Sequence, residues 1–319
     1  MNKFVTFFFA AIVLAQIDCS KLGQSRISSG FTANIYDVPC FTSLYINFPF
    51  SDVYRTCGGC LIAKNKVVTS AGCVSIPEEG LTTNIAFSFG TFKNVKPRLG
   101  FKKIKVPTGY DYTNLKSGSN IAVITLNNTV TLNTLVQTTT PSSNSTLDAY
   151  VGEDLFVCGI GDTDNDGNRP LTLRCTYLTV VPSAQCASAS AAATTAAATT
   201  VAGATTAAGA TTAAAETTAA ATTADPAATT TAAPAATTTA AAATTAASPT
   251  PQIICTLNIN DANVCHGDEG SPVFSNSTGS LQFVGVVSHF PDVKPNAPCK
   301  DGHMVAITQV GSFSTWINL

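Results

Sequence analysis

The side chains best suited to acid–base or metal chemistry are few in this chain. Its only histidines are His266, His289 and His303, all in the last fifth of 319 residues. No histidine in the first four fifths is available as a general base. Two histidines and a glutamate can hold zinc or act as an acid–base pair, and His266, His289 and Glu269 are such a set. More often such histidines are simply exposed, and we expect no metal ion and no cofactor.

The charge balance of the chain is close to neutral. Lys and Arg number 17 against 19 Asp and Glu, which gives a formal net charge of −2. Attraction of nucleic acid by counterion release needs a basic surface, and this balance predicts none. We therefore expect no nucleic-acid partner.

The hydrophobic content of 45% overstates the sequence that can form a core. Between Ala187 and Thr250, 32 of 64 residues are Ala and 21 are Thr. Removal of these 64 residues from 319 leaves 255, enough for one large domain or two small ones.

The Ala/Thr-rich insertion, residues 187–254, contains paired Thr with scattered Pro and no aromatic residue. Such a segment cannot bury a core, and we expect it to be disordered. Dense Thr with Pro is typical of a mucin-like, O-glycosylated stalk. Its blocks are also similar to the Thr-Ala-Ala repeats of antifreeze glycoproteins, although the spacing is irregular. The tract thus leaves open a mucin-like coat or adhesive role and an ice-binding role.

The first nineteen residues have the layout of a secretory signal peptide. Lys3 is followed by an apolar run from Phe4 to Ala15, which is too short to span a bilayer. Cleavage after Ala15 and cleavage after Cys19 both fit. We therefore expect a secreted, extracellular monomer without a membrane anchor, with residues 1–19 removed.

The cysteines and sequons fit the same compartment. The chain has 11 Cys, which in an exported protein indicate disulfides rather than metal ligands. If Cys19 leaves with the signal, ten remain and can pair evenly. Asn127, Asn144 and Asn276 begin Asn-x-Thr sequons in polar segments and are expected N-glycosylation sites.

Outside the tract, short runs of alternating or β-branched residues are separated by turn residues, and long helical patterns are missing. This pattern predicts an all-β antiparallel sandwich or barrel. The expected strands are Phe41–Phe48, Gly59–Thr69, Ile85–Phe92, Ile121–Leu126, Leu155–Gly159, Leu171–Val181, Phe283–Val287 and Val305–Val310. Strand-like sequence resumes after the tract at Ile253–Asn258.

Three segments in the right order resemble the trypsin and chymotrypsin family. Cys57–Cys73 is similar to the family's C-G-G-S-L-I and T-A-A-H-C segments, Asn120–Leu126 to D-I-A-L-I-K-L, and Cys265–Pro272 to C-x-G-D-S-G-G-P. Val310–Ile317 resembles the closing helix. The resemblance implies two six-stranded antiparallel β-barrels of the chymotrypsin type with a C-terminal helix. The domain would comprise residues 27–186 and 255–319, after a leader of residues 20–26.

The same resemblance shows that all three triad positions are replaced. Gly72 stands where the family has histidine, Asn120 where it has aspartate, and Glu269 where it has the nucleophilic serine. The amides of Gly267 and Glu269 would be remnants of the oxyanion hole, with the Glu269 carboxylate opposing a developing negative charge. We expect no enzyme; residual or unconventional serine-type endopeptidase activity is the alternative.

The family pattern also assigns a pocket and an activation site. Asn263 would lie at the base of the specificity pocket, with Phe290 and Val305 on walls that the family keeps as Gly, and His289 in place of a cleft-lining Trp. Cleavage after Arg26 would free the amino group of Ile27 to pair with Asp268. Alternatively, Arg26 is only a residue of a short leader.

The resemblance implies a disulfide framework as well. Three pairs follow the family and two more link expected neighbouring strands: Cys57–Cys73, Cys186–Cys255, Cys265–Cys299, Cys158–Cys175 and Cys40–Cys60. The second pair would close the tract into a loop beside the former substrate cleft. The sequence therefore predicts a secreted, non-catalytic serine protease homologue that acts by binding an unknown protein or glycan, or through its O-glycosylated loop.

Overall fold

The computed structural model describes most of the sequence outside the tract. The described residues are 30–48, 55–77, 80–82, 84–90, 100–162, 170, 172–188, 252–258, 264–293 and 303–318. The signal segment, Arg26, Ile27, Asn263, Cys299 and residues 189–251 of the tract lie outside them. No helix within the described part is long and apolar enough to cross a membrane.

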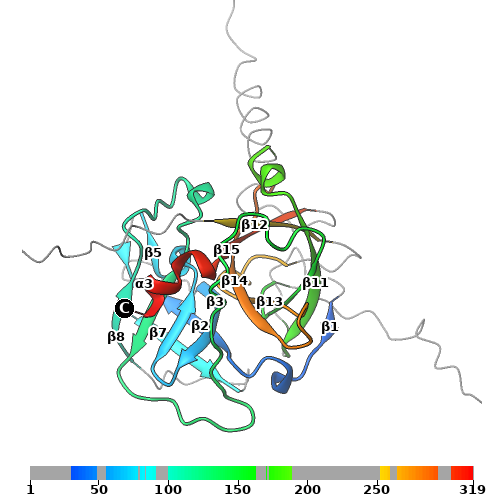
Figure 1. Ribbon diagram of the computed structural model, residues 1–319. Coiled ribbons are helices and arrows are strands. Elements are labelled where there is room, and N and C mark those ends of the chain that lie inside the picture. The colour runs from blue at the N-terminus through cyan, green and yellow to red at the C-terminus, as the bar shows by residue number, and fades with distance from the viewer. Residues whose placement is uncertain are drawn as a thin grey trace, which may run out of the picture.

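The described chain forms two antiparallel sheets that lie side by side (Figure 1). The first has six strands in the order β7-β2-β3-β4-β9-β8. Among the described residues, β7 and β8 form its edges. Its strands are β2 (Phe41–Asn47), β3 (Arg55–Ala63), β4 (Lys66–Thr69), β7 (Asn84–Phe89), β8 (Phe101–Lys105) and β9 (Ala122–Leu126).

The second sheet has seven strands in the order β1-β11-β10-β13-β14-β15-β12, and pairing of β11 with β12 closes six of them into a barrel. The two-residue strand β1 (Phe31–Thr32) pairs with β11 outside this ring. The others are β10 (Asp154–Gly159), β11 (Arg174–Val181), β12 (Ile253–Asn258), β13 (Pro272–Ser275), β14 (Gln282–His289) and β15 (Met304–Gln309). The all-β fold expected from the sequence is confirmed, with one closed barrel and one six-stranded sheet.

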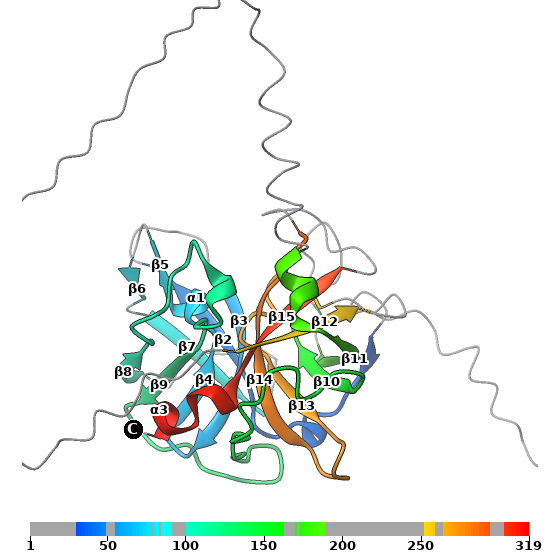
Figure 2. The same cartoon turned by 45° about the horizontal axis from the view of Figure 1, so that its top comes forward.

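Short elements complete the fold. Helix α1 (Ala71–Val74) follows β4, and the C-terminal pair η4 (Val310–Phe313) and α3 (Ser314–Asn318) forms the closing helix, whose first turn is 3₁₀ (Figure 2). Further short elements are η2 (Ile35–Asp37), η3 (Leu115–Ser117), the hairpin of β5 (Ser75–Ile76) and β6 (Gly80–Leu81), and a helical turn over residues 183–188.

Two strand expectations need correction. The run Gly59–Thr69 is two antiparallel strands, because the chain turns at Lys64 and Asn65. The expectation also missed β8, whose sequence Phe-Lys-Lys-Ile-Lys lacks simple alternation because Lys102 is an extra residue at a break in register with β9. A bulge of this kind removes the period of two on which strand recognition depends.

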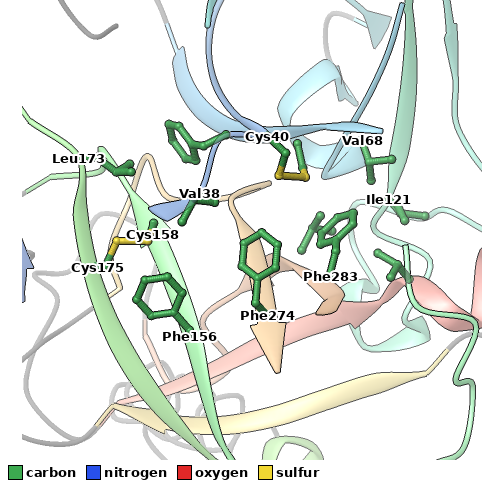
Figure 3. Close-up of a cluster of buried hydrophobic side chains, with 14 of the residues drawn as sticks. Val38, Cys40, Val68, Ile121, Phe156, Cys158, Leu173, Cys175, Phe274 and Phe283 are labelled. Carbon is green, nitrogen blue, oxygen red and sulfur yellow. A yellow bond between two sulfur atoms is a disulfide. The ribbon is translucent and has the colours of Figure 1, made fainter. Parts of the chain in front are cut away.

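A buried cluster joins the two sheets (Figure 3). The first sheet contributes Val68 and Val123, and the second contributes Phe274 and Phe283. The disulfides Cys40–Cys60 and Cys158–Cys175 lie in the same cluster, so both line the contact between the sheets. The first joins Cys60 of β3 to Cys40, the residue directly before β2, which pairs with β3. The second joins Cys158 of β10 to Cys175 of the paired strand β11.

The framework of disulfides contains four of the five expected pairs: Cys40–Cys60, Cys57–Cys73, Cys158–Cys175 and Cys186–Cys255. Cys265 is also disulfide-bonded, and its expected partner lies outside the described residues. The Cα atoms of Cys186 and Cys255 are 5.7 Å apart. The two ends of the tract therefore leave the second barrel next to each other.

A turn of the second barrel packs directly against the first sheet. The Gly58 amide donates to the Glu269 carbonyl oxygen at 2.8 Å. A Cβ atom at Gly270, whose φ is +77°, would approach the Thr69 hydroxyl within 2.1 Å. Glycine at position 270 therefore lets this turn dock on β3 and β4.

Replacement of Gly270 by Ala should destabilise the fold strongly, by roughly 3 kcal/mol or more, because backbone strain and a collision with Thr69 add. Gly279 is the matched control, since it has the same φ of +77° but no atom within 4 Å of an added Cβ. Gly279→Ala should cost only about 1 kcal/mol. Equal losses in urea unfolding of the two variants would show that the docked turn does not matter.

Candidate functional site

Gly72 and Asn120, which the resemblance assigns to two positions of the triad, are in direct contact. The Gly72 amide in α1 donates to Asn120 Oδ1 at 2.8 Å. A Cβ atom on Gly72 would lie 3.6 Å from both Asn120 Oδ1 and the Tyr110 hydroxyl, which is ordinary contact. A side chain at position 72 would therefore project toward Asn120, but glycine supplies none and the backbone takes up the contact.

The Asn120 amide is buried and fully engaged. Its Nδ2 donates to the Ser288 carbonyl at 3.1 Å and to Ser288 Oγ at 2.9 Å. Ser288 Oγ, which accepts from Asn120, also forms a hydrogen bond with His289 Nδ1 at 2.9 Å. Burial, with a smaller effect from Lys116, lowers the pKa of His289 to about 4. At neutral pH His289 is thus an uncharged ring whose Nδ1 is occupied.

This chain of hydrogen bonds is shielded from solvent. Ser288 is buried, with only 3% of its surface exposed. A neutral amide at position 120 cannot stabilise an imidazolium ion as a carboxylate does. The arrangement fixes the end of β14 to the first sheet.

Glu269 folds back onto its own turn, at the place that the resemblance assigns to the oxyanion hole. Its Oε2 accepts from the Gly267 amide at 2.7 Å, and its Oε1 lies 3.7 Å from His266 Nδ1. Gly267 has a φ of +92°, a conformation that favours glycine. The backbone donor expected to face a substrate is therefore bonded to a carboxylate of the same turn.

The expected pocket walls are packed. Phe290 is 9% exposed, and its ring meets the rings of His266 and His303 edge to face, with centroids 5.6 and 5.5 Å apart. Val305 is fully buried in the same core as Phe290 and Val264. An aromatic ring between two imidazoles thus fills the region where the resemblance puts the substrate slot. Asn263, the expected base, lies outside the described residues.

His266, His289 and Glu269 are not brought together as a metal site. His289 is bonded to Ser288, whereas His266 faces Glu269 and Phe290. Within the described part of the chain, no group of three or more His, Cys, Asp or Glu side chains is arranged to hold a metal ion.

Comparison with known proteins identifies the family. A family model described as Trypsin matches residues 27–217, more than half of the chain. The chain belongs to the trypsin family. The match begins at Ile27 and ends inside the Ala/Thr-rich insertion, while β12–β15, beyond the insertion, complete the second barrel.

Curated relatives agree with this assignment. Chymotrypsin-like elastase family member 1 of Macaca fascicularis is 33% identical over 141 residues, which cover 43% of this chain and 51% of the relative. Trypsin of Xenopus laevis is 30% identical over 52% of this chain and 63% of the relative. The chain thus spans about half the length of the elastase relatives that it matches.

A solved structure shares the fold. Human heparin binding protein superposes with a TM-score of 0.57 at 17% identity, over 91% of this chain and 94% of that one. At this identity the likeness concerns the fold alone.

In this trypsin-family chain the carboxylate of Asp268 is buried. Its Oδ1 accepts from the Gly161 amide at 2.6 Å and its Oδ2 from the Cys265 amide at 3.0 Å. A Cβ atom at Gly159 or Gly161 would collide with the carboxylate. Burial, opposed by these two amides, raises the pKa of Asp268 to about 7. Among the described residues it has no cationic partner.

Three residues of this site were not found from the sequence. Arg55 donates to the Gly72 carbonyl at 2.7 Å, and Tyr110 donates to the Ser75 carbonyl at 3.2 Å. Ser288 joins Asn120 to His289. The sequence offered a signal only for Ser288, because it directly precedes His289 in a strand. Arg55 begins a strand and Tyr110 lies in a loop, and neither is close in sequence to the other residues of the site.

Stability of the uncut chain should fall as pH rises from about 4 to about 7. The pKa of Asp268 is about 7 in the folded chain against 3.8 ordinarily. The folded state therefore holds the Asp268 proton more tightly than the unfolded state does. The resulting contribution to the free energy of unfolding is complete below pH 3.8 and is lost as pH rises through 7. Asp268→Asn should flatten the slope of melting temperature against pH in this window.

Asp111→Asn is the control for that experiment. Hydrogen bonds from Thr113 lower the pKa of the exposed Asp111, so its contribution is lost only in acid, and the slope at neutral pH should stay as in the wild type. A wild-type slope in Asp268→Asn would contradict the assignment to Asp268.

Proposed function

We propose that this trypsin-family protein is secreted, does not cleave peptide bonds, and acts by binding a protein or glycan partner. The observation that carries the proposal is the hydrogen bond from the Gly267 amide to Glu269 Oε2, beside a glycine at the position of the catalytic base. In this proposal, Glu269 replaces the nucleophile and also occupies the oxyanion donor. Gly72 replaces the base and Asn120 replaces the carboxylate that orients it.

The size of the loss supports a non-catalytic role. Removal of a complete triad lowers turnover by about a millionfold, and the residual thousandfold acceleration over water comes from the oxyanion hole and binding. Here the donor of that hole is bonded to Glu269, and Phe290 fills the expected slot. Little is left that could hold or activate a peptide bond.

Secretion is supported by the disulfides and the sequons. The described residues contain four disulfides, and Cys265 belongs to a further one; such bonds persist in oxidising compartments. Asn127, Asn144 and Asn276 are exposed, as N-glycosylation requires. We include removal of residues 1–19 and N-glycosylation at these three sites in the proposal.

Cleavage after Arg26 belongs to the proposal as a conformational step without catalysis. Thr32 of β1 pairs with Arg174, and Arg174 pairs with Gly159, against which Asp268 packs. The distance across the sheet from Thr32 to Gly159 is two strand spacings, about 10 Å. The three residues from Gly30 back to Ile27 can span up to about 10 Å. The chain between Gly30 and Ile27 is thus long enough for a new amino group at Ile27 to approach the Asp268 carboxylate, which has no cationic partner among the described residues.

The tract contributes to function as a displayed loop. Its ends meet at the Cys186–Cys255 bridge, and its Thr-rich composition suits O-glycosylation. A mucin-like coat or adhesive role of this loop is the second candidate, because the bridge isolates it from the folded domain formed by residues 27–186 and 255–319. Residues 189–251 lie outside the described structure.

Fluorophosphonate labelling tests the lack of catalysis. The chain cut after Arg26 and its Glu269→Ser variant should both remain unlabelled and should hydrolyse a broad peptide library no faster than heat-killed samples, because Gly72 and Asn120 supply no base. Active trypsin in the same assay serves as the positive control. Labelling of the wild type would overturn the proposal, and labelling of Glu269→Ser would show that a base exists elsewhere.

Deletion of residues 189–251 tests the separation of loop and domain. With the Cys186–Cys255 bridge kept, the melting temperature should change by less than about 3 °C, since long surface loops cost little. Mass heterogeneity removed by O-glycosidase should disappear from the deletion variant. Unfolding of the variant would mean that the tract is part of the folded domain, and unchanged heterogeneity would place the glycans elsewhere.

A further inference from the structure

The outer surface of the first sheet carries an unusual concentration of positive charge. Five lysines lie on β4, on β8 and in the turn before β4; we call them the basic face: Lys64, Lys66, Lys102, Lys103 and Lys105. Figure 2 shows β4, β9 and β8 next to one another beside α3. The near-neutral net charge of the whole chain predicted no basic surface, and the structure corrects that expectation.

The sheet register puts Lys66, Lys103 and Lys105 on one side of the sheet. Lys66 pairs with Thr125, and Thr125 pairs with Lys103. Residues directly opposite in antiparallel strands share a face. The adjacent row, with Val67 and Ile124, points into the first core, so the row of lysines points outward.

The spacing of the lysines suits an extended polyanion. Lys66 and Lys103 are separated by two strands, about 10 Å, and Lys103 and Lys105 by two residues along one strand, about 7 Å. Lys105 is held in place by the C-terminal helix, with its Nζ donating to the Trp316 carbonyl and lying 4.5 Å from the centre of the Trp316 ring. The face thus presents a broad charged surface rather than a single point.

The lysines of the basic face have no acidic partner among the residues that the structure describes. Within the described residues, no carboxylate forms an ion pair with any of the five lysines. Burial lowers the pKa of Lys105, and repulsion from Lys103 and Lys66 lowers it further. In sequence, residues 80–110 contain six Lys or Arg and no Asp or Glu, so this part of the chain accumulates like charge.

Protection of a sheet edge explains only part of the face. Lysines on an edge strand discourage pairing with another chain, and β8 is an edge among the described strands. Lys66, however, lies on β4, between β3 and β9 in the middle of the sheet. A lysine there does not protect an edge.

We propose that the basic face binds a linear sulfated polysaccharide. The disulfide-rich fold belongs to an oxidising compartment, where sulfated glycans are a common polyanion. Single-stranded nucleic acid binding uses exposed aromatic platforms, and membrane surfaces take exposed apolar groups. The described residues of β4, β8 and β9 expose no large hydrophobic or aromatic side chain.

The test is binding of fluorescent dextran sulfate to the full chain, measured by anisotropy, with unsulfated dextran as the matched polymer control. Dextran sulfate should bind at low salt and dissociate as salt rises, whereas dextran should not bind. Lys103→Gln should weaken binding about fivefold and Lys66→Gln/Lys103→Gln about 25-fold. The salt slope should fall by about one per lysine removed.

Lys116→Gln is the control with the same charge change. Lys116 is exposed but lies on η3 near His289, away from the basic face, so its loss should weaken binding less than twofold. Circular dichroism melting checks that all variants fold. Equal weakening by Lys116→Gln and Lys103→Gln, no binding of dextran sulfate, or tighter binding of an oligonucleotide or an anionic vesicle would overturn the proposal. These outcomes are independent of peptide hydrolysis.

Discussion

The contact between one turn of the second barrel and two strands of the first sheet determines the geometry of the site. Gly58 donates to the Glu269 carbonyl, and Gly270 fits against Thr69 because it has no side chain. Through this contact Glu269 is brought close to the bridge of Cys73, whose Sγ lies 3.5 Å from the Glu269 carbonyl oxygen, and hence to α1. The proximity of Gly72, Asn120 and Glu269 thus depends on contacts of the backbone.

The groups around these positions form hydrogen bonds with one another. Gly72 bonds to Asn120, Asn120 to Ser288, and Ser288 to His289. In a catalytic site, hydrogen-bond donors and charged groups stay available to a substrate. Here the groups form hydrogen bonds with one another. Glu269 does the same for the Gly267 amide. Asp268 is the exception, since its buried carboxylate accepts two amides but meets no cation among the described residues.

Sequence patterns predicted the fold class and most strands, because alternation and turn residues are local signals. They drew attention to Gly72, Asn120 and Glu269 through short motifs; Gly72 contacts Asn120, and Glu269 lies beside Cys73, the residue after Gly72. They did not predict that Glu269 turns back onto Gly267, since this depends on the φ of +92° at Gly267. They also missed β8 at its bulge, and with it the basic face. Net charge is a sum over the chain and cannot show that Lys66 and Lys103 share a row.

The account depends most on the state of the Gly267 amide, which in an active enzyme must be open to substrate. Amide hydrogen exchange measured by NMR reports directly on this group. We predict slow exchange of the Gly267 amide in the wild type and at least tenfold faster exchange in Glu269→Ala. Equal exchange rates in the two proteins would mean that the carboxylate does not occupy this donor, and would contradict the account.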